Sequence, residues 1–527
     1  MNSVPSLYEL IKQISDYEKI GSINKALNLS RYITQAFPLE VDSWLEAGKL
    51  LSRVNNHKMA IHCFSEASTL TPQDLYVKSI LALEYARSGE TNKALRLISS
   101  ISLDGVRETQ ILSILGNACS ICDEQTQAFQ LFERAVSLEN KNLEHKYNLA
   151  NSYRFLGNNL ESEKLFDEVL IDNPMDGDAI LTRSRLRKQT NENNHIEWLL
   201  KQLKKADSDS ELKTSIQYAL AKEYEDLGES ELSFFNLKEA SARRRASMDY
   251  SVEADINSIN FVIDTFSKPG ASISESYCNN AEPIFIVGLP RSGTTLTERI
   301  LDSHTKIKSA GELKNFSSQI KRLIRPPSYQ SKYGSFMDLA HQIDPLLLGQ
   351  SYIDSTRPRT GQVPHFIDKM PQNYMNIGLI LRSLPKAKII VLERNPMDTC
   401  YALFKAYFTS GVRFSYSLTD LGKYYLAYRK LMEFWNALYS KQLHIVSYED
   451  LVLDTENQAK GIIKYCGLNW EEQCLQFYKN TSPSSTASTS QVRRPIYTSS
   501  LNRWMKYRPQ LKILEDMFVT AGIDIGT

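Results

Sequence analysis

Residues 283–303 read PIFIVGLPRSGTTLTERILDS, and this stretch decides the fold of the second half of the chain. The apolar run 283–287 is typical of a buried parallel strand, and residues 296–303 read as an amphipathic helix. A loop bounded by Gly288 and Gly293 lies between them. A strand, a glycine-bounded loop and a helix N-terminus in this order present backbone N–H groups and the helix dipole to a phosphate. The stretch therefore predicts an α/β domain with a phosphate-binding loop.

This loop departs from the Walker A pattern at one position. The spacing of Gly288 and Gly293 matches that pattern, but Thr294 stands where a Lys should follow the second glycine. Arg291, inside the loop, supplies the positive charge instead. A loop with this charge suits a smaller anionic group than a triphosphate, such as one phosphate that carries a sulfonate.

A second strand candidate also lacks a magnesium ligand. Residues 387–392 form an apolar run that ends in Glu393 and Arg394, not in the Asp that holds magnesium in ordinary P-loop enzymes. An ordinary nucleoside triphosphatase is therefore disfavoured, and we expect no metal.

The chain before this domain repeats every 34 residues. Small residues recur in two columns, Ala26, Ala60, Ala94, Ala128 and Ser162, and Gly48, Ala82, Gly116 and Ala150. Candidates for a positive backbone φ recur at Gly21, Asn55, Gly89, Asp123 and Gly157. A large apolar column is formed by Phe64, Ile98, Phe132 and Phe166, and a proline phase by Pro38, Pro72 and Pro174.

Each column has a structural reason. Two antiparallel helices cross closely only where a side chain is small, and a residue with positive φ ends the first helix of each pair. Proline ends the second helix, and the large apolar column fills the groove between modules. The period and residue types together resemble the tetratricopeptide repeat over residues 7–182.

These patterns predict the organisation of the whole chain. We expect an all-α solenoid over residues 1–267, with a degenerate helix pair at 211–243, a short helix with loops within 183–210 and a capping helix at 244–266. Residues 268–282 are rich in Ser, Gly and Asn and read as a linker. Residues 283–527 alternate strands and helices, so we expect a P-loop-like α/β domain with a central parallel sheet.

Composition excludes several other classes of protein. Lys and Arg number 62 against 61 Asp and Glu, so a general polycation that binds nucleic acid or membrane is disfavoured. Seven cysteines in 527 residues do not form a disulfide scaffold, and the lone Cys119-x-x-Cys122 reads as two buried small side chains. We find neither a long apolar run nor a signal peptide, and we expect a cytoplasmic protein.

Two segments resemble a known family when taken together. Residues 283–304 are similar to the 5′-phosphosulfate loop of sulfotransferases, and residues 389–404, IIVLERNPMDTCYALF, are similar to their 3′-phosphate segment. With the repeats, the chain resembles bacterial tetratricopeptide-repeat sulfotransferases and, more distantly, tyrosylprotein sulfotransferases. The resemblance implies that residues 283–527 are a sulfotransferase domain and that the sulfate donor is 3′-phosphoadenosine 5′-phosphosulfate.

The resemblance also assigns donor-binding residues. The donor's 5′ end falls to Arg291, Ser292, Gly293, Thr294 and Thr295. Arg394 matches the residue that binds the 3′-phosphate, a task that suits a planar guanidinium. Many sulfotransferases place a Ser eight positions later, where this chain has Ala402. A contact to the 3′-phosphate must then come from elsewhere, with Arg493 or backbone N–H groups as candidates.

Sulfuryl transfer needs a base, a cation near the bridging oxygen and an aligned acceptor. By resemblance Glu312 is the base, with His304 as a less favoured rival, and Lys369 stabilises the leaving group together with Arg291. The late segment 488–504 supplies the remaining candidates. Ser488, or Thr489 in its place, would contact the sulfate. The nucleotide would be clamped by Arg493, Arg494 and Arg503, and Trp504 would pack beside it.

Two other features are expected to be structural. The segment 447–451, SYEDL, is assigned to structure and not to chemistry, and Tyr424, Tyr425 and Tyr428 share one face of a helix at 417–438 and are expected in the core.

The resulting hypothesis is a sulfotransferase whose repeat domain binds a peptide or protein. A protein tyrosine is one candidate acceptor, and a carbohydrate or a small alcohol remains open. The repeat domain has a second interpretation, as a rigid spacer or dimerisation element. Two rival functions are a P-loop kinase that uses ATP and a repeat scaffold with an inactive nucleotide-binding domain. The oligomeric state stays open.

Overall fold

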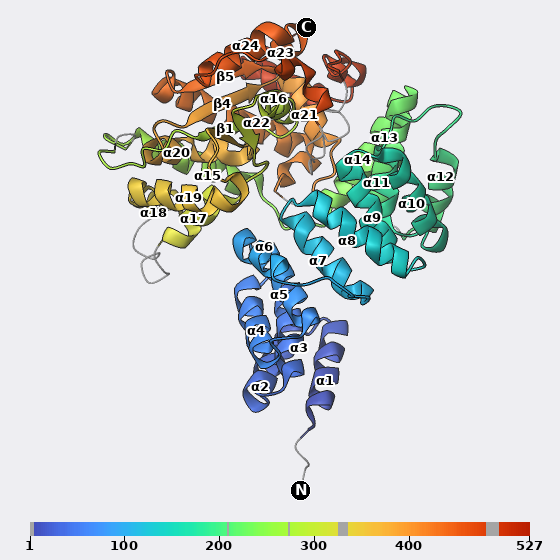
Figure 1. The fold of residues 1–527 in the computed structure, drawn as a ribbon. Coiled ribbons are helices and arrows are strands. Elements are labelled where there is room, and N and C mark those ends of the chain that lie inside the picture. Colours follow the sequence, from blue (N-terminus) through green and yellow to red (C-terminus); the bar gives the residue numbers. More distant parts are fainter. Residues whose placement is uncertain are drawn as a thin grey trace. The chain divides into compact units, whose positions relative to one another are not determined.

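The computed structural model describes residues 5–207, 210–271, 274–324, 336–409, 411–480 and 495–526. The chain divides into two compact units, residues 1–172 and 173–527. None of the helices in the described ranges is both long enough and apolar enough to cross a membrane. We describe each unit by itself (Figure 1).

The first unit is a series of antiparallel helix pairs. Its helices are α1 (Leu7–Lys19), α2 (Ile23–Ala36), α3 (Val41–Arg53), α4 (His57–Leu70), α5 (Leu75–Arg87), α6 (Thr91–Ser99), α7 (Thr109–Ile121), α8 (Gln125–Leu138), α9 (Leu143–Leu156) and α10 (Asn159–Asp172). Helices of the same kind begin 34 residues apart, the odd-numbered at Leu7, Val41, Leu75, Thr109 and Leu143 and the even-numbered at Ile23, His57, Thr91, Gln125 and Asn159. This confirms the predicted tetratricopeptide-type solenoid.

The columns of the sequence have the predicted geometry. All five turn residues, Gly21, Asn55, Gly89, Asp123 and Gly157, adopt positive φ, between 59° and 89°. The small residues of the first column are fully buried. At Gly48 an added Cβ would lie 2.5 Å from the ring of Phe64, so the glycine allows α3 and α4 to approach.

The large apolar column does more than fill the groove between modules. Phe64 lies against Gly48 of its own module and also clusters with Val77 and Leu81 of the next helix, α5. The same ring therefore closes the helix pair and joins it to the following one. Cys119 and Cys122 are buried, as expected, and burial raises the pKa of Cys119 to about 12.

The second unit continues with helices and then enters an α/β domain. Its first helices are α11 (Gly177–Arg185), α12 (Ile196–Lys205), α13 (Glu211–Leu227), α14 (Ser230–Ala246) and α15 (Val252–Ser267). α13 and α14 are the predicted degenerate pair, and α12 is the short helix. The capping helix begins at Val252 and not at residue 244, because α14 extends to Ala246.

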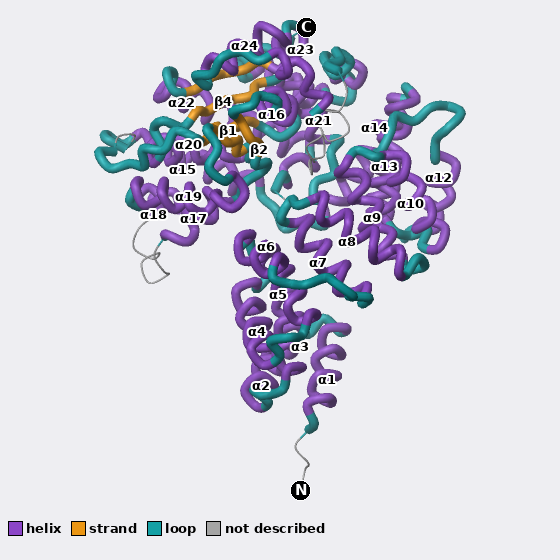
Figure 2. Tube along the Cα trace, in the orientation of Figure 1, coloured by secondary structure: helices purple, strands orange, loops and turns teal. Residues whose placement is uncertain are grey.

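A five-stranded parallel sheet forms the centre of this unit (Figure 2). Its strands are β1 (Pro283–Gly288), β2 (Ile307–Ser309), β3 (His365–Asp368), β4 (Lys388–Glu393) and β5 (Leu443–Ser447), in the order β2-β3-β1-β4-β5. β1 is central and wholly buried, with Ile286 beside Ile390 of β4 and Phe285 beside Asp368 of β3. The parallel sheet that the sequence predicts is thereby confirmed.

Helices cover both faces of the sheet. The α-helices are α16 (Thr294–Asp302), α17 (Asn315–Leu323), α18 (Phe336–His341), α19 (Pro345–Thr360), α20 (Ile377–Ser383), α21 (Pro396–Phe404), α22 (Leu418–Tyr439), α23 (Tyr448–Leu453), α24 (Thr455–Tyr465) and α25 (Lys512–Thr520). Short 3₁₀ turns lie at η2 (Pro371–Asn376), η3 (Arg413–Tyr416), η4 (Glu472–Lys479) and η5 (Arg503–Tyr507). Because strand side chains alternate, Ile284 packs with α16 and α24, while Phe285 packs on Phe316 and Tyr352 of α17 and α19.

The helices before the sheet pack directly on this domain. Phe234 of α14 lies 5.8 Å from Phe404 of α21, and Phe266 of α15 lies 5.1 Å from Trp435 of α22, measured between ring centroids. α13 to α15 therefore share a core with the α/β domain. The sequence placed the domain boundary at the linker 268–282, whereas the compact unit begins at Asn173.

Candidate functional site

The candidate residues follow the carboxyl ends of the parallel strands. Arg291 follows β1, Arg394 follows β4, Glu312 follows β2 and Lys369 follows β3. The carboxyl ends of parallel strands share one edge of the sheet, and ligands of α/β proteins bind at that edge where the strand order reverses. Here the reversal occurs beside β1, since β3 and β4 flank it.

The loop from β1 to α16 has the form of an anion cradle. Gly288 has φ 146° and an added Cβ would meet the Leu392 carbonyl oxygen at 2.7 Å, while Gly293 has φ 107° and would meet the Tyr448 ring at 2.4 Å. Gly293 is the N-cap of α16, and no side chain in the described part of the structure caps the helix. The N–H groups of its first turn therefore point to an open site that favours an anion.

Two further groups of this region are suited to a ligand. Ser292 is buried, and its Oγ has no hydrogen-bond partner among the described residues. Arg291 holds a left-handed backbone at φ 71°, which is uncommon for a residue other than glycine. Burial lowers the pKa of Arg291, and the nearby Arg394 lowers it further, so the two cations would gain from an anion between them.

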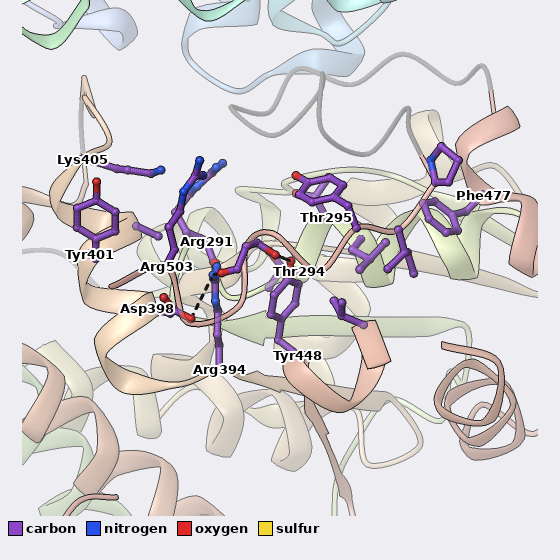
Figure 3. A pocket seen from close by; sticks show the side chains of 18 residues that line it. Arg291, Thr294, Thr295, Arg394, Asp398, Tyr401, Lys405, Tyr448, Phe477 and Arg503 are labelled. Atoms are coloured by element: carbon purple, nitrogen blue, oxygen red, sulfur yellow. Dashed lines mark hydrogen bonds and ion pairs between the residues drawn. The ribbon is translucent and has the colours of Figure 1, made fainter. Parts of the chain in front are cut away.

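A cavity opens beside this loop (Figure 3). It gathers most of the predicted donor-binding residues, namely Arg291, Gly293, Thr294, Thr295, Arg394 and Arg503. Ala402 also lines it, and contributes no polar group. Ser292 is not among the lining residues. Trp504 is not either, because its side chain is buried in the core.

Arg394 is held in place by several contacts. Its Nη1 donates to the Arg291 carbonyl at 3.0 Å and its Nη2 to the Ser500 carbonyl at 2.7 Å. The guanidinium carbon lies 4.6 Å from the ring centroid of Tyr448, a cation–π contact. The buried Nε has no partner among the described residues. A guanidinium has five N–H donors, so these two hydrogen bonds orient the side chain and leave further donors for a ligand.

Asp398 orders the chain on the other side of the cavity. It lies in the first turn of α21 and accepts hydrogen bonds from the backbone N–H groups of Asn502 and Trp504, at 2.7 and 2.9 Å. These bonds fix the start of η5 and so place Arg503 at the cavity. Ser488, Thr489, Arg493 and Arg494 lie outside the described residues.

Sequence reasoning missed Lys405 and Glu225, which form a charged cluster with the predicted Arg503 beside the same cavity. Lys405, at the end of α21, places its Nζ 2.9 Å from Oε2 of Glu225 on α13, and Arg503 Nε lies 3.5 Å from Oε1. The Tyr401 hydroxyl donates to Glu225 Oε1 at 2.8 Å. Burial would raise the pKa of Glu225, but Lys405 and Arg503 outweigh it and lower the pKa to about 2. Glu225 is therefore a stable anion between two cations.

Sequence reasoning also did not place Tyr448 at the cavity. It belongs to the segment 447–451 that the sequence assigned to structure, and it does buttress Gly293, yet it also lines the cavity and donates or accepts a hydrogen bond with Ser500 Oγ at 2.9 Å. The sequence gives a weak indication of Lys405, because this residue lies three positions after Ala402 and therefore on the same helical face. It gives no indication of Glu225.

Glu312 and Lys369 pair with each other. Lys369 is 1% exposed, and its Nζ lies 2.5 Å from Glu312 Oε1 and 3.8 Å from Glu298 Oε2 on α16. The backbone N–H of Lys369 donates to the Gly311 carbonyl at 2.8 Å, which couples the segments after β2 and β3. Neither residue lines the cavity described above, but Glu298 links the pair to the helix that begins at the cavity.

The environment of this pair separates its two members. The Glu312 side chain is 46% exposed, so a solvent-borne hydroxyl can reach it, whereas Lys369 is buried. Burial raises the pKa of Glu298, opposed by Lys369 and by a hydrogen bond of 2.6 Å from Ser309 Oγ. An accessible carboxylate beside a buried ammonium can supply a general base and a stabilising cation.

The rival base and the tyrosine face are both buried. His304 is buried, its Nε2 lies 2.9 Å from the Asn469 carbonyl, and its Nδ1 accepts from the Lys306 N–H at 3.1 Å. Tyr424, Tyr425 and Tyr428 are buried, as expected. Within the described part of the chain no group of three or more His, Cys, Asp and Glu side chains is arranged to hold a metal.

Comparison with known proteins agrees with this geometry. Residues 283–472 match the family described as "Sulfotransferase family". A protein of Aquifex aeolicus (strain VF5), described as uncharacterized, is 34% identical over 247 residues, which cover 45% of this chain and 32% of that protein. The chicken "Protein-tyrosine sulfotransferase 2" is 25% identical over 262 residues, which cover 46% of this chain and 67% of that protein.

The match to the Aquifex protein thus spans about a third of that relative's length. Among solved structures, a sulfotransferase domain from the curacin biosynthetic pathway aligns with 15% identity and a TM-score of 0.34, over 47% of this chain and 100% of that chain.

Proposed function

We propose that this chain, which carries a sulfotransferase family domain at residues 283–472 beside a tetratricopeptide-type solenoid, transfers a sulfuryl group from 3′-phosphoadenosine 5′-phosphosulfate to a hydroxyl acceptor. One observation carries the proposal. The uncapped start of α16 and four cations, Arg291, Arg394, Lys405 and Arg503, converge on one cavity at the carboxyl edge of the sheet.

The free groups of the cavity fit this donor. The first-turn N–H groups of α16 suit its 5′-phosphosulfate, and Arg394, whose Nε has no hydrogen-bond partner among the described residues, suits its 3′-phosphate. When bound, the donor supplies a sulfuryl group attached to a good leaving group. Fixed N–H groups and guanidinium ions need no reorganisation to stabilise charge that develops on the leaving oxygen.

Glu312 and Lys369 act on the acceptor side of this proposal. Glu312 takes the proton of the attacking hydroxyl at its Oε atoms, since it is the accessible member of the pair. Lys369 is held by Glu312 and Glu298 and supplies positive charge toward the bridging oxygen. Proton transfer to Glu312 would weaken its ion pair with Lys369, which frees the ammonium at the moment when charge develops on the leaving group.

A protein tyrosine is the acceptor that we favour. Relatives named protein-tyrosine sulfotransferases match over nearly half of this chain, and repeat solenoids present surfaces that bind peptides or proteins. In this proposal the solenoid recruits the acceptor protein or a partner. A carbohydrate or a small alcohol would be the alternative outcome of an acceptor screen. A cytoplasmic location remains part of the prediction.

The test is a transfer assay with isotope-labelled donor over peptide, glycan and small-alcohol acceptors. Wild type should label a peptide that contains tyrosine, and Arg291→Ala should reduce transfer at least a hundredfold, while the exposed control variant Arg322→Ala on α17 should not. Equal labelling by wild type and Arg291→Ala would refute the role of the loop. Phosphate transfer from labelled ATP would favour the kinase, and failure to bind any nucleotide would favour the inactive scaffold.

A further inference from the structure

Glu298 is a buried carboxylate that takes no direct part in the proposed transfer. It lies in the middle of α16, and its side chain is only 8% exposed. A carboxylate in such a place lowers stability unless partners compensate its lost hydration. Burial raises the pKa of Glu298, whereas Lys369 and Ser309 lower it. The chain therefore surrounds this carboxylate with groups that favour its charged form.

The two oxygens of Glu298 have different partners. Oε1 accepts a hydrogen bond of 2.6 Å from Ser309 Oγ at the end of β2, and Ser309 Oγ in turn accepts the Gly311 N–H at 3.1 Å. Oε2 lies 3.8 Å from Lys369 Nζ. The first contact orients the carboxylate, and the second directs its charge to the buried ammonium.

Lys369 needs more than one counterion if Glu312 is the base. In the proposed transfer the acceptor oxygen bonds to sulfur, the bond from sulfur to the bridging oxygen breaks, and the acceptor proton passes to Glu312. Glu312 is then neutral, and its 2.5 Å contact with Lys369 is no longer an ion pair. A buried ammonium without a counterion is strongly destabilised. Glu298 is the carboxylate that still lies beside it.

We propose that Glu298 is the permanent counterion of Lys369, a positioning residue that keeps the ammonium charged and in place after Glu312 has taken the acceptor proton. The inference rests on the proposed function and adds a residue to it. The longer distance suits this role, because a charge 3.8 Å away offsets the ammonium less than one at 2.5 Å. Lys369 is thereby retained while much of its charge can act on the bridging oxygen.

Thermal unfolding of the full chain tests the counterion without donor or acceptor. Glu298→Gln and Glu312→Gln each leave one carboxylate beside Lys369, whereas the double variant leaves none among the described residues. We expect the double variant to melt at least about 5 °C below the sum of the two single shifts, because it strands a buried charge. Adding Lys369→Met to the double variant should abolish this extra loss.

Steady-state kinetics with labelled donor test the role in transfer. Glu298→Gln should lower kcat at least about tenfold, less than the loss of a direct transition-state donor. KM for the donor should stay within about threefold, since Glu298 does not line the cavity. In the Lys369→Met background the same substitution should change kcat less than about twofold, because no ammonium remains to be held. A general packing defect would lower kcat in both backgrounds.

A gentler variant and a control complete the design. Ser309→Ala keeps the charge of Glu298 but removes its hydrogen bond, so it should lower kcat less than Glu298→Gln does and have no further effect when the two are combined. This variant decides the question if Glu298→Gln folds poorly. Glu456→Gln on α24, which removes an exposed pair with Lys460, is the matched control and should leave kcat and melting unchanged.

The outcomes separate the two proposals. Additive melting shifts, or an equal loss of kcat with and without Lys369, would overturn the role of Glu298 and leave the proposed function standing. A wild type that transfers no sulfuryl group to any acceptor would overturn the proposed function, and the role of Glu298 in transfer with it. Non-additive melting in that case would still identify Glu298 as a counterion of Lys369.

Discussion

Glu312 is the residue whose replacement should separate catalysis from binding. We expect Glu312→Gln to lower kcat by about 10²- to 10⁴-fold, the usual contribution of a general base, because the amide cannot take the acceptor proton. Affinity for adenosine 3′,5′-bisphosphate should stay within threefold, since Glu312 does not line the cavity. Steady-state rates and calorimetry check the two halves.

The control for this prediction is Glu433→Gln on the exposed face of α22, where the carboxylate is 68% exposed. Full turnover by Glu312→Gln would remove this residue as the base.

Glu225 makes stability depend on pH in the acid range. Its pKa of about 2 in the folded state lies below the value of 4.5 for a free glutamate. A carboxyl with a depressed folded pKa adds stability that is complete above the unfolded pKa and is lost as the pH falls through the folded one. We expect about 3 kcal/mol to disappear between about pH 5 and pH 2, from a shift of that size.

Urea unfolding of wild type and Glu225→Gln at pH 6 and at pH 3 measures this effect. The free-energy difference between the two proteins should be large at pH 6 and should shrink at pH 3. A difference that is the same at both values would contradict the ion-pair account.

The sequence predicted the residues that lie next to recognisable patterns. Arg291 and Arg394 each follow an apolar run, so a strand end and a charge could be read together. Lys405 and Glu225 meet across 180 positions of the chain. No periodicity links two such residues, and only the packing of α13 on α21 brings them together.

At the scale of elements, the close approach of α3 and α4 depends on Gly48. Gly48→Ala should lower the free energy of unfolding of the solenoid by about 1–3 kcal/mol, because the methyl group would overlap the Phe64 ring. Phe64→Ile should restore most of the loss when the two are combined, as Ala82 and Ile98 occupy the equivalent positions in the next module. Thermal unfolding of the single and double variants checks this.

The comparison would fail if the double variant were no more stable than Gly48→Ala alone. Gly461→Ala on α24 is a suitable control, since an added Cβ there meets no atom within 4 Å.

Helix positions in the solenoid were predictable because each module repeats the same local rules. One period governs the small residues, the positive-φ turn residues and the prolines that follow α2, α4 and α10. Each module therefore fixes its own helix positions, and an error in one module does not shift the next. The limits of α14 and α15 were not, since these helices leave the repeat and their lengths follow from packing against the α/β domain.

For the whole molecule, we expect that the second unit can fold and bind nucleotide without the first unit, but not without its own first helices. Residues 173–527 should fold alone and bind adenosine 3′,5′-bisphosphate within threefold of the full chain, because they contain the complete cavity. Residues 283–527 should fail to unfold cooperatively, since they lack Phe234 and Phe266 and expose Phe404 and Trp435. Differential scanning calorimetry and titration check both fragments.

Tight nucleotide binding by residues 283–527 would contradict this division of the chain and would remove Glu225 from the site.

The class of the whole fold could be predicted, but its assembly could not. Apolar runs that alternate with helices indicated a parallel sheet, yet the order β2-β3-β1-β4-β5 depends on which strand edges pair, and residue patterns do not encode this directly. The pairing of Glu312 with Lys369 follows from that order, because it makes β2 and β3 neighbours.

The position of α13 decides where a chimera that exchanges the first unit of this protein should be joined. A graft joined within residues 268–282 would discard Glu225, the carboxylate that pairs with Lys405 and Arg503, whereas a junction after Asp172 would keep it. Chimeras joined after Asp172 should therefore keep the nucleotide affinity of the parent protein and differ only in the partner that they bind.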